Sequence, residues 1–546
     1  MKLFRFTYLR RDFNRWSIYT LAIIAFIVIP ILTIFFKLFS GPGESWSHMI
    51  KYLLLDYSLN SLYLILGCTL LTLVFGVSSA WIVSRYKLPF QRALEWLLIL
   101  PLAIPSYITA YAYAGFFDYG GSLEFLLRNI GLTSSKFSVT NIYGLIFVLS
   151  ISLFPYVYVV SRAVFLYQSG RLIEASKTLG ASEFQTFFKI VLPMARPAIV
   201  GGLVLVLMEV LNDYGAAKYY GVNTFTTGIF RSWFALEEIS TAVYLSAILL
   251  VLVFAIIGIE RFLRGNRSYE ISGKSDFKLP KLALSPGWRV LVFIVVSIPI
   301  LCGFVLPLGQ LLYWTVLTFS KVASLSFVTI AFQSLGIAFL TSLLTVTFAL
   351  LVVHFPLWNR IKLLSKSSHL AILGYAIPGA VIAIGVMIPT LHLDKWLIKM
   401  GKQMFDLDLG LLINGTLVVL IYAYIIRFIA VAFNPIEAGQ LKIGKSLSES
   451  SRLLGKGTLK TFFKIDLPLL KPSLFSAFIL VFVDAMKELP LTLILKPYDI
   501  NTLAVKAYEY ASDELVMESA LPSLCIIITG VIPILFLNRL ILNGTK

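Results

Sequence analysis

Residues 174–193 read EASKTLGASEFQTFFKIVLP, and residues 449–468 read ESSRLLGKGTLKTFFKIDLP. Both stretches lie between long apolar runs, and both carry Glu, Lys, Ser and Gly, which the interior of a membrane would exclude. The second stretch follows the first at a constant offset of 275 residues, so that TFFKI and the later Leu-Pro align without a gap. A repeat in such register indicates that the chain consists of two related halves.

Each of the two stretches predicts a helical elbow that stands outside the membrane. The pattern is a short helix, a glycine suited to a left-handed turn, a second short helix with an aromatic face, and Leu-Pro to stop that helix before the next apolar run. Such a mixed Phe and Lys surface suits the groove of a partner protein. An amphipathic helix lying among lipid headgroups is the alternative.

The composition is that of an integral membrane protein. Of 546 residues, 58% are hydrophobic and 14% are charged, and the mean hydropathy is +0.87, which is more apolar surface than a soluble core could bury. The apolar runs have the length of about 20 residues that an α-helix needs to cross the hydrocarbon layer. We therefore expect an all-α fold with about twelve transmembrane helices. They are placed near residues 17–39, 60–84, 94–116, 141–165, 196–216, 240–262, 288–313, 331–354, 368–391, 412–433, 471–491 and 517–540.

The repeat divides these helices into two sets of six. Because six is even, both halves enter the membrane from the same side and form parallel repeats. We expect a first lobe at residues 1–265 with its elbow within 170–195, a cytoplasmic linker at 266–287, and a second lobe at 288–546 with its elbow within 440–470.

The net charge of +18 is explained by orientation in the membrane. Lys and Arg concentrate in the loops that lie inside when both termini are cytoplasmic, as the positive-inside rule requires. A nucleic-acid partner is therefore not indicated. Cys68, Cys302 and Cys525 lie far apart in apolar surroundings, and they predict neither a disulfide framework nor a metal site.

Four carboxylates fall within or at the ends of predicted spans, where ionisable groups are costly and mark a transport pathway or a buried pair. The repeat offset superimposes the two pairs, which are Glu209 with Asp213 and Asp484 with Glu488. A cavity lined by them would favour a cation such as ferric iron without binding it tightly, and Tyr214, Tyr219 and Tyr220 would add hard oxygen ligands. The alternative is structural: the acids cap helices or pair with backbone groups and Lys487.

One further motif has the letters of an ATP-binding site. GQLKIGKS at residues 439–446 satisfies the phosphate-loop pattern G-x-x-x-x-G-K-[ST]. A working phosphate loop follows a strand inside a soluble α/β domain, whereas this run follows an apolar span directly. We therefore expect no nucleotide site here, and ATP chemistry would have to come from another chain.

At the repeated stretches the chain resembles the permeases of binding-protein-dependent ABC importers. Their cytoplasmic loop carries the signature E-A-A, three residues, G, nine residues, I-x-L-P. The matching residues here are Glu174, Ala175, Gly180, Ile190 and Pro193, and then Glu449, Ser450, Gly455, Ile465 and Pro468. Serine replaces the alanine of the signature at Ser176, Ser450 and Ser451, which keeps the side chains small.

The resemblance implies how such a chain works. In that family the loop is a coupling helix that docks onto a separate ATP-hydrolysing subunit, so two loops imply two copies of an ATP-binding subunit, which would hold the ATP and Mg²⁺. It also implies a soluble substrate-binding protein on the periplasmic or extracellular side of a bacterial inner (plasma) membrane. The chain itself would be a translocation subunit without a cofactor, and it would not be an enzyme.

The cargo implied by the resemblance is ferric iron. Fused two-lobe permeases for ferric iron are similar in MEVLNDYGAAKYYGVNTFTTGIFRSWF from Met208 and in DAMKELPLTLILKPYDINTLAVKAYEY from Asp484. Fused thiamine permeases share the length and both loops, so thiamine or another small cation is the alternative. A secondary transporter driven by an ion gradient also has two parallel six-span halves, but it needs no duplicated elbow. A membrane-embedded enzyme is disfavoured because no His, Cys or Asp cluster has catalytic spacing.

Overall fold

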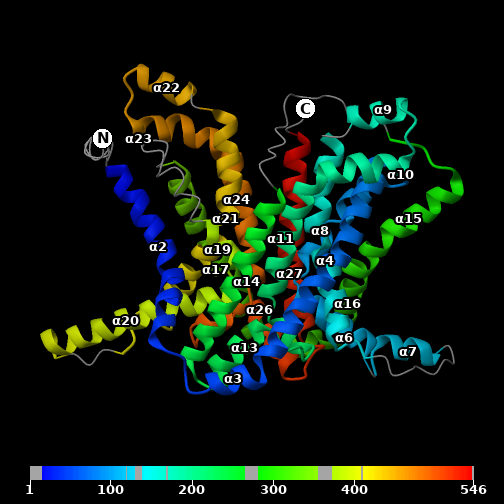
Figure 1. Cartoon of the computed structure of the whole chain (residues 1–546). Coiled ribbons are helices and arrows are strands. Elements are labelled where there is room, and N and C mark those ends of the chain that lie inside the picture. The colour runs from blue at the N-terminus through cyan, green and yellow to red at the C-terminus, as the bar shows by residue number, and fades with distance from the viewer. Residues whose placement is uncertain are drawn as a thin grey trace. The chain divides into compact units, whose positions relative to one another are not determined.

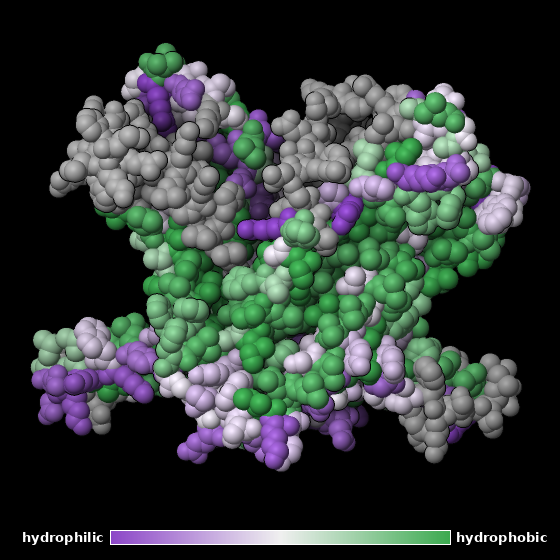
Figure 2. Space-filling model, viewed as in Figure 1, coloured by the Kyte–Doolittle hydropathy of each residue, from purple (hydrophilic) through white to green (hydrophobic). Residues whose placement is uncertain are grey.

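The fold is all-α, as the sequence predicts. A computed structural model describes residues 15–118, 120–129, 138–167, 170–264, 281–354, 372–406, 410–444 and 446–543 (Figure 1). Over these residues the chain forms helices, and the β-structure is limited to an isolated bridge between Tyr86 and Leu282. Hydrophobic side chains cover the middle of the helices, and hydrophilic ones gather toward their ends (Figure 2).

The helices agree closely with the expected spans. Ten helical segments of the described chain are long and apolar enough to cross a membrane. The third expected span corresponds to two helices, Gln91–Ala103 and Ser106–Asn129, that meet at 93°. The twelfth begins as a shorter apolar helix, Ala520–Ile532. The main helices are α2 (Arg15–Lys37), α4 (Leu54–Arg85), α8 (Ile142–Tyr167), α11 (Leu192–Asn212), α14 (Ile239–Arg264), α16 (Leu306–Val322), α17 (Leu325–His354), α20 (Gly379–Phe405), α21 (Leu417–Ile443), α24 (Leu467–Lys487) and α27 (Ala520–Asn543).

The chain folds into two compact units. Unit 1 comprises residues 1–42, 324–506 and 528–546, and unit 2 comprises residues 43–323 and 507–527. The lobe boundaries taken from the sequence repeat stay a prediction, and most of the expected linker at 266–287 lies outside the described residues.

Each unit contains the first helix of the other half of the sequence. In unit 1, α2 packs against α20 and α17. In unit 2, α15 (Pro286–Ile300) and α16 pack against α4 and α6 (Ser106–Phe117). Hydropathy places the spans, but it carries no information about which span packs on which.

The repeat is visible in the core of each unit. In unit 2, α4, α8 and α11 pack together, and in unit 1 the corresponding helices α17, α21 and α24 do the same. Small residues permit the close contacts, as is usual between membrane helices. A Cβ on Gly76 would lie 2.7 Å from Cβ of Val157, so α4 and α8 can meet at this distance only with glycine there.

The structure corrects the expectation that Leu-Pro stops a helix before each span. Pro193 and Pro468 lie in the first turn of α11 and α24. A π-turn directly precedes each of these helices without a break, at residues 187–191 and 462–466. The same arrangement precedes Pro307, where residues 301–305 form a π-turn. Proline lacks an N–H donor and its ring crowds the preceding turn. A wider π-turn accommodates this without breaking the helix.

The packing of α2 gives a first prediction. A Cβ on Gly385 of α20 would lie 2.6 Å from the backbone oxygen of Pro30 in α2. We expect Gly385→Val to push α2 away and to destabilise the protein by about 1–3 kcal/mol, the usual cost of overpacking, in thermal unfolding of the detergent-solubilised chain. Gly336→Val in α17 is the control, because a Cβ there meets nothing within 4 Å. Equal shifts for both variants would contradict this packing.

Candidate functional site

The first elbow, residues 174–193, has the predicted helix-turn-helix form. It joins α9 (Gly170–Thr178) to α10 (Glu183–Thr186). Gly180 has a φ of +81°, and its N–H donates to the backbone oxygen of Lys177 at 2.9 Å. The left-handed residue closes α9, as in common helix C-caps. Ser182 and Gln185 then form a capping box that starts α10.

The second elbow, residues 449–468, repeats this geometry in unit 1. It joins α22 (Ser446–Leu453) to α23 (Thr458–Thr461). Gly455 has a φ of +76°, and its N–H donates to the backbone oxygen of Arg452 at 3.0 Å. The prediction of a left-handed glycine in each elbow is therefore confirmed.

A buried pair of hydroxyls fixes the angle of each elbow. The hydroxyls of Ser176 and Thr186 lie 3.0 Å apart, and those of Ser451 and Thr461 lie 2.9 Å apart. All four side chains are buried. Ser176 and Ser451 occupy the third position of the E-A-A signature, so the serine that replaces alanine there has a structural use.

Each elbow is attached to a neighbouring span by one phenylalanine. The ring of Phe187 lies 5.0 Å from that of Trp81 in α4. In unit 1 the ring of Phe462 lies 4.7 Å from that of His354, the last residue of α17. These contacts place one member of each repeated Phe-Phe pair against the membrane-spanning core and leave the other outside.

Polar contacts that the sequence did not reveal strengthen both attachments. Arg85, at the end of α4, donates two hydrogen bonds to Glu183, at 2.8 and 3.1 Å. In the second elbow, His354 Nε2 lies 3.1 Å from Asp466, which also accepts a hydrogen bond of 2.6 Å from Ser448. The two spans end in different residues, Arg85 and His354, and they contact acids at different positions of the repeat, since Glu183 corresponds to Thr458 and Asp466 to Val191. A search for identical repeated letters cannot find such contacts.

The outer side of both elbows exposes apolar side chains at repeated positions. In the first elbow these are Leu179, Phe184 and Phe188, exposed to 87%, 72% and 48%. In the second they are Leu454, Leu459 and Phe463, exposed to 80%, 49% and 60%. We call each set of three a docking face. Exposed apolar clusters of this kind typically mark contact surfaces.

The signature residues surround these docking faces. The exposed ones are Glu174, Ala175, Gly180, Pro193, Glu449, Ser450, Gly455 and Pro468. Ile190 and Ile465 are half-buried. The elbows therefore expose the other signature residues and partly cover the two isoleucines.

Asp213, one of the four predicted pathway acids, caps a helix. It is buried at the end of α11 and accepts hydrogen bonds from the backbone N–H groups of Ala216 and Ala217, at 3.0 and 3.1 Å. These N–H groups belong to the short helix α12 (Gly215–Tyr219). The hydroxyl of Ser106 donates a third hydrogen bond, of 2.6 Å.

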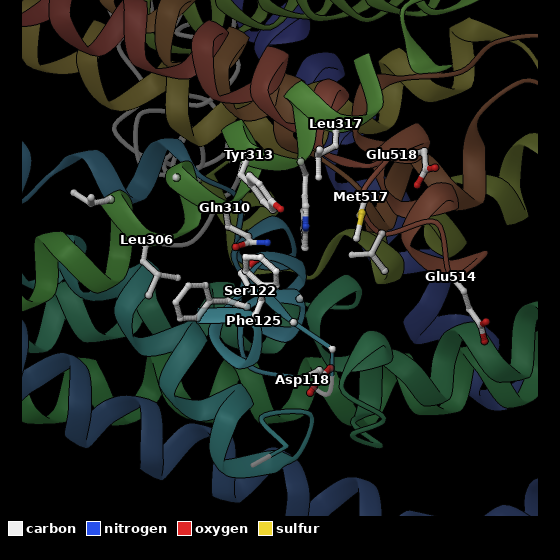
Figure 3. A pocket seen from close by; sticks show the side chains of 18 residues that line it. Asp118, Ser122, Phe125, Leu306, Gln310, Tyr313, Leu317, Glu514, Met517 and Glu518 are labelled. Carbon is white, nitrogen blue, oxygen red and sulfur yellow. The ribbon is translucent and has the colours of Figure 1, made fainter. Parts of the chain in front are cut away.

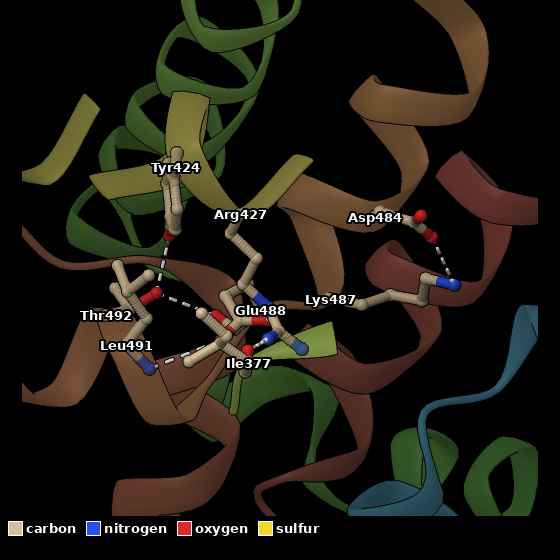
Figure 4. Close-up of polar contacts among 8 residues, drawn as sticks. All are labelled: Ile377, Tyr424, Arg427, Asp484, Lys487, Glu488, Leu491 and Thr492. Atoms are coloured by element: carbon tan, nitrogen blue, oxygen red, sulfur yellow. Dashed lines mark hydrogen bonds and ion pairs between the residues drawn. The ribbon is translucent and has the colours of Figure 1, made fainter. Parts of the chain in front are cut away.

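Glu488 occupies the equivalent place in unit 1, but it is part of an ion pair (Figure 4). Arg427 Nε donates to its carboxylate at 3.0 Å, and the N–H of Leu491 donates at 3.3 Å. Arg427 also donates to the backbone oxygen of Ile377 at 2.9 Å. Arg427 and Glu488 are both buried. Arg427 was not among the predicted site residues, although a lone cation within the apolar run of α21 indicates a buried ionic partner.

The other acids and the tyrosines are more dispersed. Asp484 forms a partly exposed ion pair of 3.1 Å with Lys487, and Glu209 is half-buried on α11. Tyr214 stacks on Phe230 and accepts a hydrogen bond from Tyr508, whereas Tyr220 donates to Ala110. The ring of Tyr219 lies against that of Tyr111.

Across the described residues, no group of three or more His, Cys, Asp and Glu side chains could hold a metal ion. A pathway role for the four acids stays a prediction.

In the run at residues 439–446, the described residues 439–444 and 446 do not follow a strand, as those of a phosphate loop would. Gly439 lies inside α21, which continues to Ile443, and Gly444 ends the helix with a φ of +70°. The run therefore follows a membrane-spanning helix and leads into α22, where a phosphate loop would follow a strand.

The buried ion pair gives a second prediction. Arg427→Met would leave Glu488 buried without its cation, and we expect a loss of about 3–5 kcal/mol in unfolding free energy. Arg427→Met combined with Glu488→Met should restore much of the stability, because both charges are then removed. Lys487→Met is the control: its pair with Asp484 is partly exposed, and we expect a change of about 0–1 kcal/mol. Thermal unfolding in detergent measures all three, and an additive double variant would contradict the pairing.

Comparisons with known proteins agree with this geometry. Residues 72–263 match the family described as "Binding-protein-dependent transport system inner membrane component". An Fe(3+)-transport system permease protein of Haemophilus influenzae is 28% identical over 88% of this chain and 89% of its own length. A ferric transport system permease protein of Actinobacillus pleuropneumoniae is 25% identical over 85% of this chain and 69% of its own length. A sulfate transport system permease protein of Escherichia coli is 31% identical over 28% of this chain and 53% of its own length. Residues 72–263 thus match the binding-protein-dependent transport family, and most of the chain is similar to permease proteins of ferric transport systems.

Proposed function

We propose that this chain is the membrane-spanning subunit of an ATP-driven importer of ferric iron, with ATP hydrolysed on two separate subunits. The observation that carries the proposal is the pair of elbows with equivalent docking faces. A duplicated surface of one shape suits two copies of one partner. The elbows would then lie in the cytoplasm together with both termini, and a substrate-binding protein would deliver the cargo on the other side.

The helices support a direct route from the docking face into the membrane. Residues 183–212 form one helical segment, which at 1.5 Å per residue is roughly 45 Å long. One end carries Phe184 and Phe188 of the docking face, and Asp213 follows the other end. Movement of an attached ATPase subunit would therefore shift α11 as a rod, and the capped end near Asp213 would move with it.

The second half contains an equivalent helical segment. Residues 458–487 form one helical segment, with Leu459 and Phe463 at the docking face and Glu488 directly after its far end. ATP-driven closure of the two partner subunits would move both helical segments. This movement would switch the translocation path between its inward-facing and outward-facing states. Such coupling needs partner contacts that differ between the two states.

Ferric iron is supported by relatives that cover most of this chain and are named for ferric transport. The half-buried Glu209 would contribute negative charge to the predicted pathway, whereas Glu488 pairs with Arg427 and Asp484 pairs with Lys487. Thiamine or another small cation remains the alternative cargo. Uptake driven by an ion gradient is the alternative mechanism, and the duplicated docking faces count against it.

The docking faces give a third prediction. We expect Phe188→Glu combined with Phe463→Glu to reduce co-purification of the ATP-binding subunit at least tenfold, because a charge replaces an apolar contact at the centre of each face. Tyr498→Glu is the matched control, since Tyr498 is fully exposed outside both elbows. Full retention of the subunit by the elbow variant would contradict docking at these faces.

The cargo gives a fourth prediction. In cells that lack this chain, uptake of radiolabelled ferric iron should fall and should return when the wild-type chain is restored. The elbow variant with both Phe→Glu changes should fail to restore uptake. If the deletion abolishes uptake of labelled thiamine and leaves iron uptake unchanged, the cargo is thiamine, and the chain is still an importer subunit. Iron uptake that continues in vesicles without ATP would contradict ATP coupling.

A further inference from the structure

Unit 2 contains a cavity of about 840 Å³ that is lined neither by residues of the first elbow nor by the predicted pathway acids Glu209 and Asp213. It lies between α6, α7 (Ser122–Asn129), α16 and the loop before α27 (Figure 3). In Figure 1, α6 and α7 lie at the opposite end of unit 2 from α9 and α10 of the first elbow. The cavity is therefore on the side of the membrane away from the elbow.

The cavity lining combines an apolar wall with negative charge. Phe125, Leu306, Trp314, Leu317 and Met517 supply apolar surface. The charged lining residues are Asp118, Glu514 and Glu518, and the lining contains neither Lys nor Arg. The charge complementarity of this cavity thus favours a ligand with a long apolar part and a cationic group.

One buried donor in the wall has no acceptor. Gln310 is only 5% exposed, it lines the cavity, and its Nε2 group makes no hydrogen bond within the described chain. A buried donor without a partner costs free energy. Figure 3 shows Gln310 and Tyr313 extending from α16 toward the cavity. The ligand should therefore also carry an oxygen that accepts from Gln310.

The surroundings of the cavity are those of a lipid-facing surface. On α16, Leu312 and Val316 are exposed to 50% and 81%, as expected for a span that faces hydrocarbon. Helix α7 exposes Phe125 and carries an ion pair between Glu124 and Arg128, which suits a helix at the boundary of hydrocarbon and headgroups. A phospholipid has its polar group at this depth.

We propose that the cavity binds one phospholipid with an amine headgroup, of the phosphatidylethanolamine type. The acyl chain lies along the apolar wall, an ester or phosphate oxygen accepts the hydrogen bond from Gln310, and the ammonium group lies at the acidic rim, where Asp118, Glu514 and Glu518 surround the cavity at separate places (Figure 3). Phosphatidylglycerol has the same apolar part but a net negative charge without an amine, so the carboxylates disfavour it. The bound lipid would tie α7 to α16 at the outer end of this unit.

The test replaces a glycine in the cavity wall with a bulky residue that fills part of the cavity. Gly309 lines the cavity, and a Cβ there meets nothing within 4 Å, so Gly309→Leu adds bulk without a clash at the backbone. Gly258→Leu in α14 is the matched control, because its Cβ position is equally open and it does not line the cavity. The full-length chain and both variants are delipidated, mixed with equal amounts of phosphatidylethanolamine and phosphatidylglycerol, and examined by native mass spectrometry.

We expect the wild type and Gly258→Leu to retain one phosphatidylethanolamine at least fivefold over phosphatidylglycerol. Gly309→Leu should lose that adduct at least fivefold, and Gln310→Leu should weaken it while leaving the chain folded. Equal retention of both lipids by the wild type, or an adduct that Gly309→Leu leaves unchanged, would overturn the proposal. Displacement of the lipid by thiamine at cargo concentrations would also overturn it and would assign the cavity to a cationic cargo.

Discussion

The continuous helix that joins each elbow to a buried carboxylate is the constraint on which the rest of the structure depends. At one end, the turn at Gly180 or Gly455 and a pair of buried hydroxyls fix the elbow on the helix. At the other end, Asp213 or Glu488 caps the next short helix. The π-turns before Pro193 and Pro468 keep each rod unbroken. A displacement at the docking face can therefore reach the far end of the span without being absorbed by a hinge.

The two halves solve one structural problem with different chemistry. In unit 2, Ser106 donates to Asp213, whereas in unit 1 the corresponding residue is Gly379, and a Cβ there would lie 2.5 Å from a carboxylate oxygen of Glu488. The longer acid thus needs the smaller neighbour. Arg427 then supplies the charge that Glu488 requires, because a buried carboxylate without a partner is costly. The repeats keep the cap but differ in the charge buried beside it.

Local features of the fold could be predicted from the sequence. The apolar runs gave the spans because their length is set by the membrane, and the repeat gave both elbows and their left-handed glycines because the turn depends on a few adjacent residues. Contacts between distant residues could not be predicted. Arg427 and Glu488 are 61 residues apart, and nothing local indicates that they meet. The placement of α2 in unit 1 was equally invisible, since hydropathy does not encode which helices pack. The Leu-Pro prediction was wrong because a π-turn offers proline an alternative to ending a helix.

We propose that the elbows transmit ATP hydrolysis to transport, and ATP-dependent ferric uptake in proteoliposomes tests this most directly. These contain the chain, its ATP-binding subunits and the substrate-binding protein. Gly180→Val combined with Gly455→Val should abolish uptake, because each change strains a left-handed turn by about 1–2 kcal/mol and reorients a docking face. Gly201→Val, at a position with open space and no positive φ, should retain most of it. Uptake that persists in the double elbow variant, or in vesicles without the ATP-binding subunits, would contradict the account.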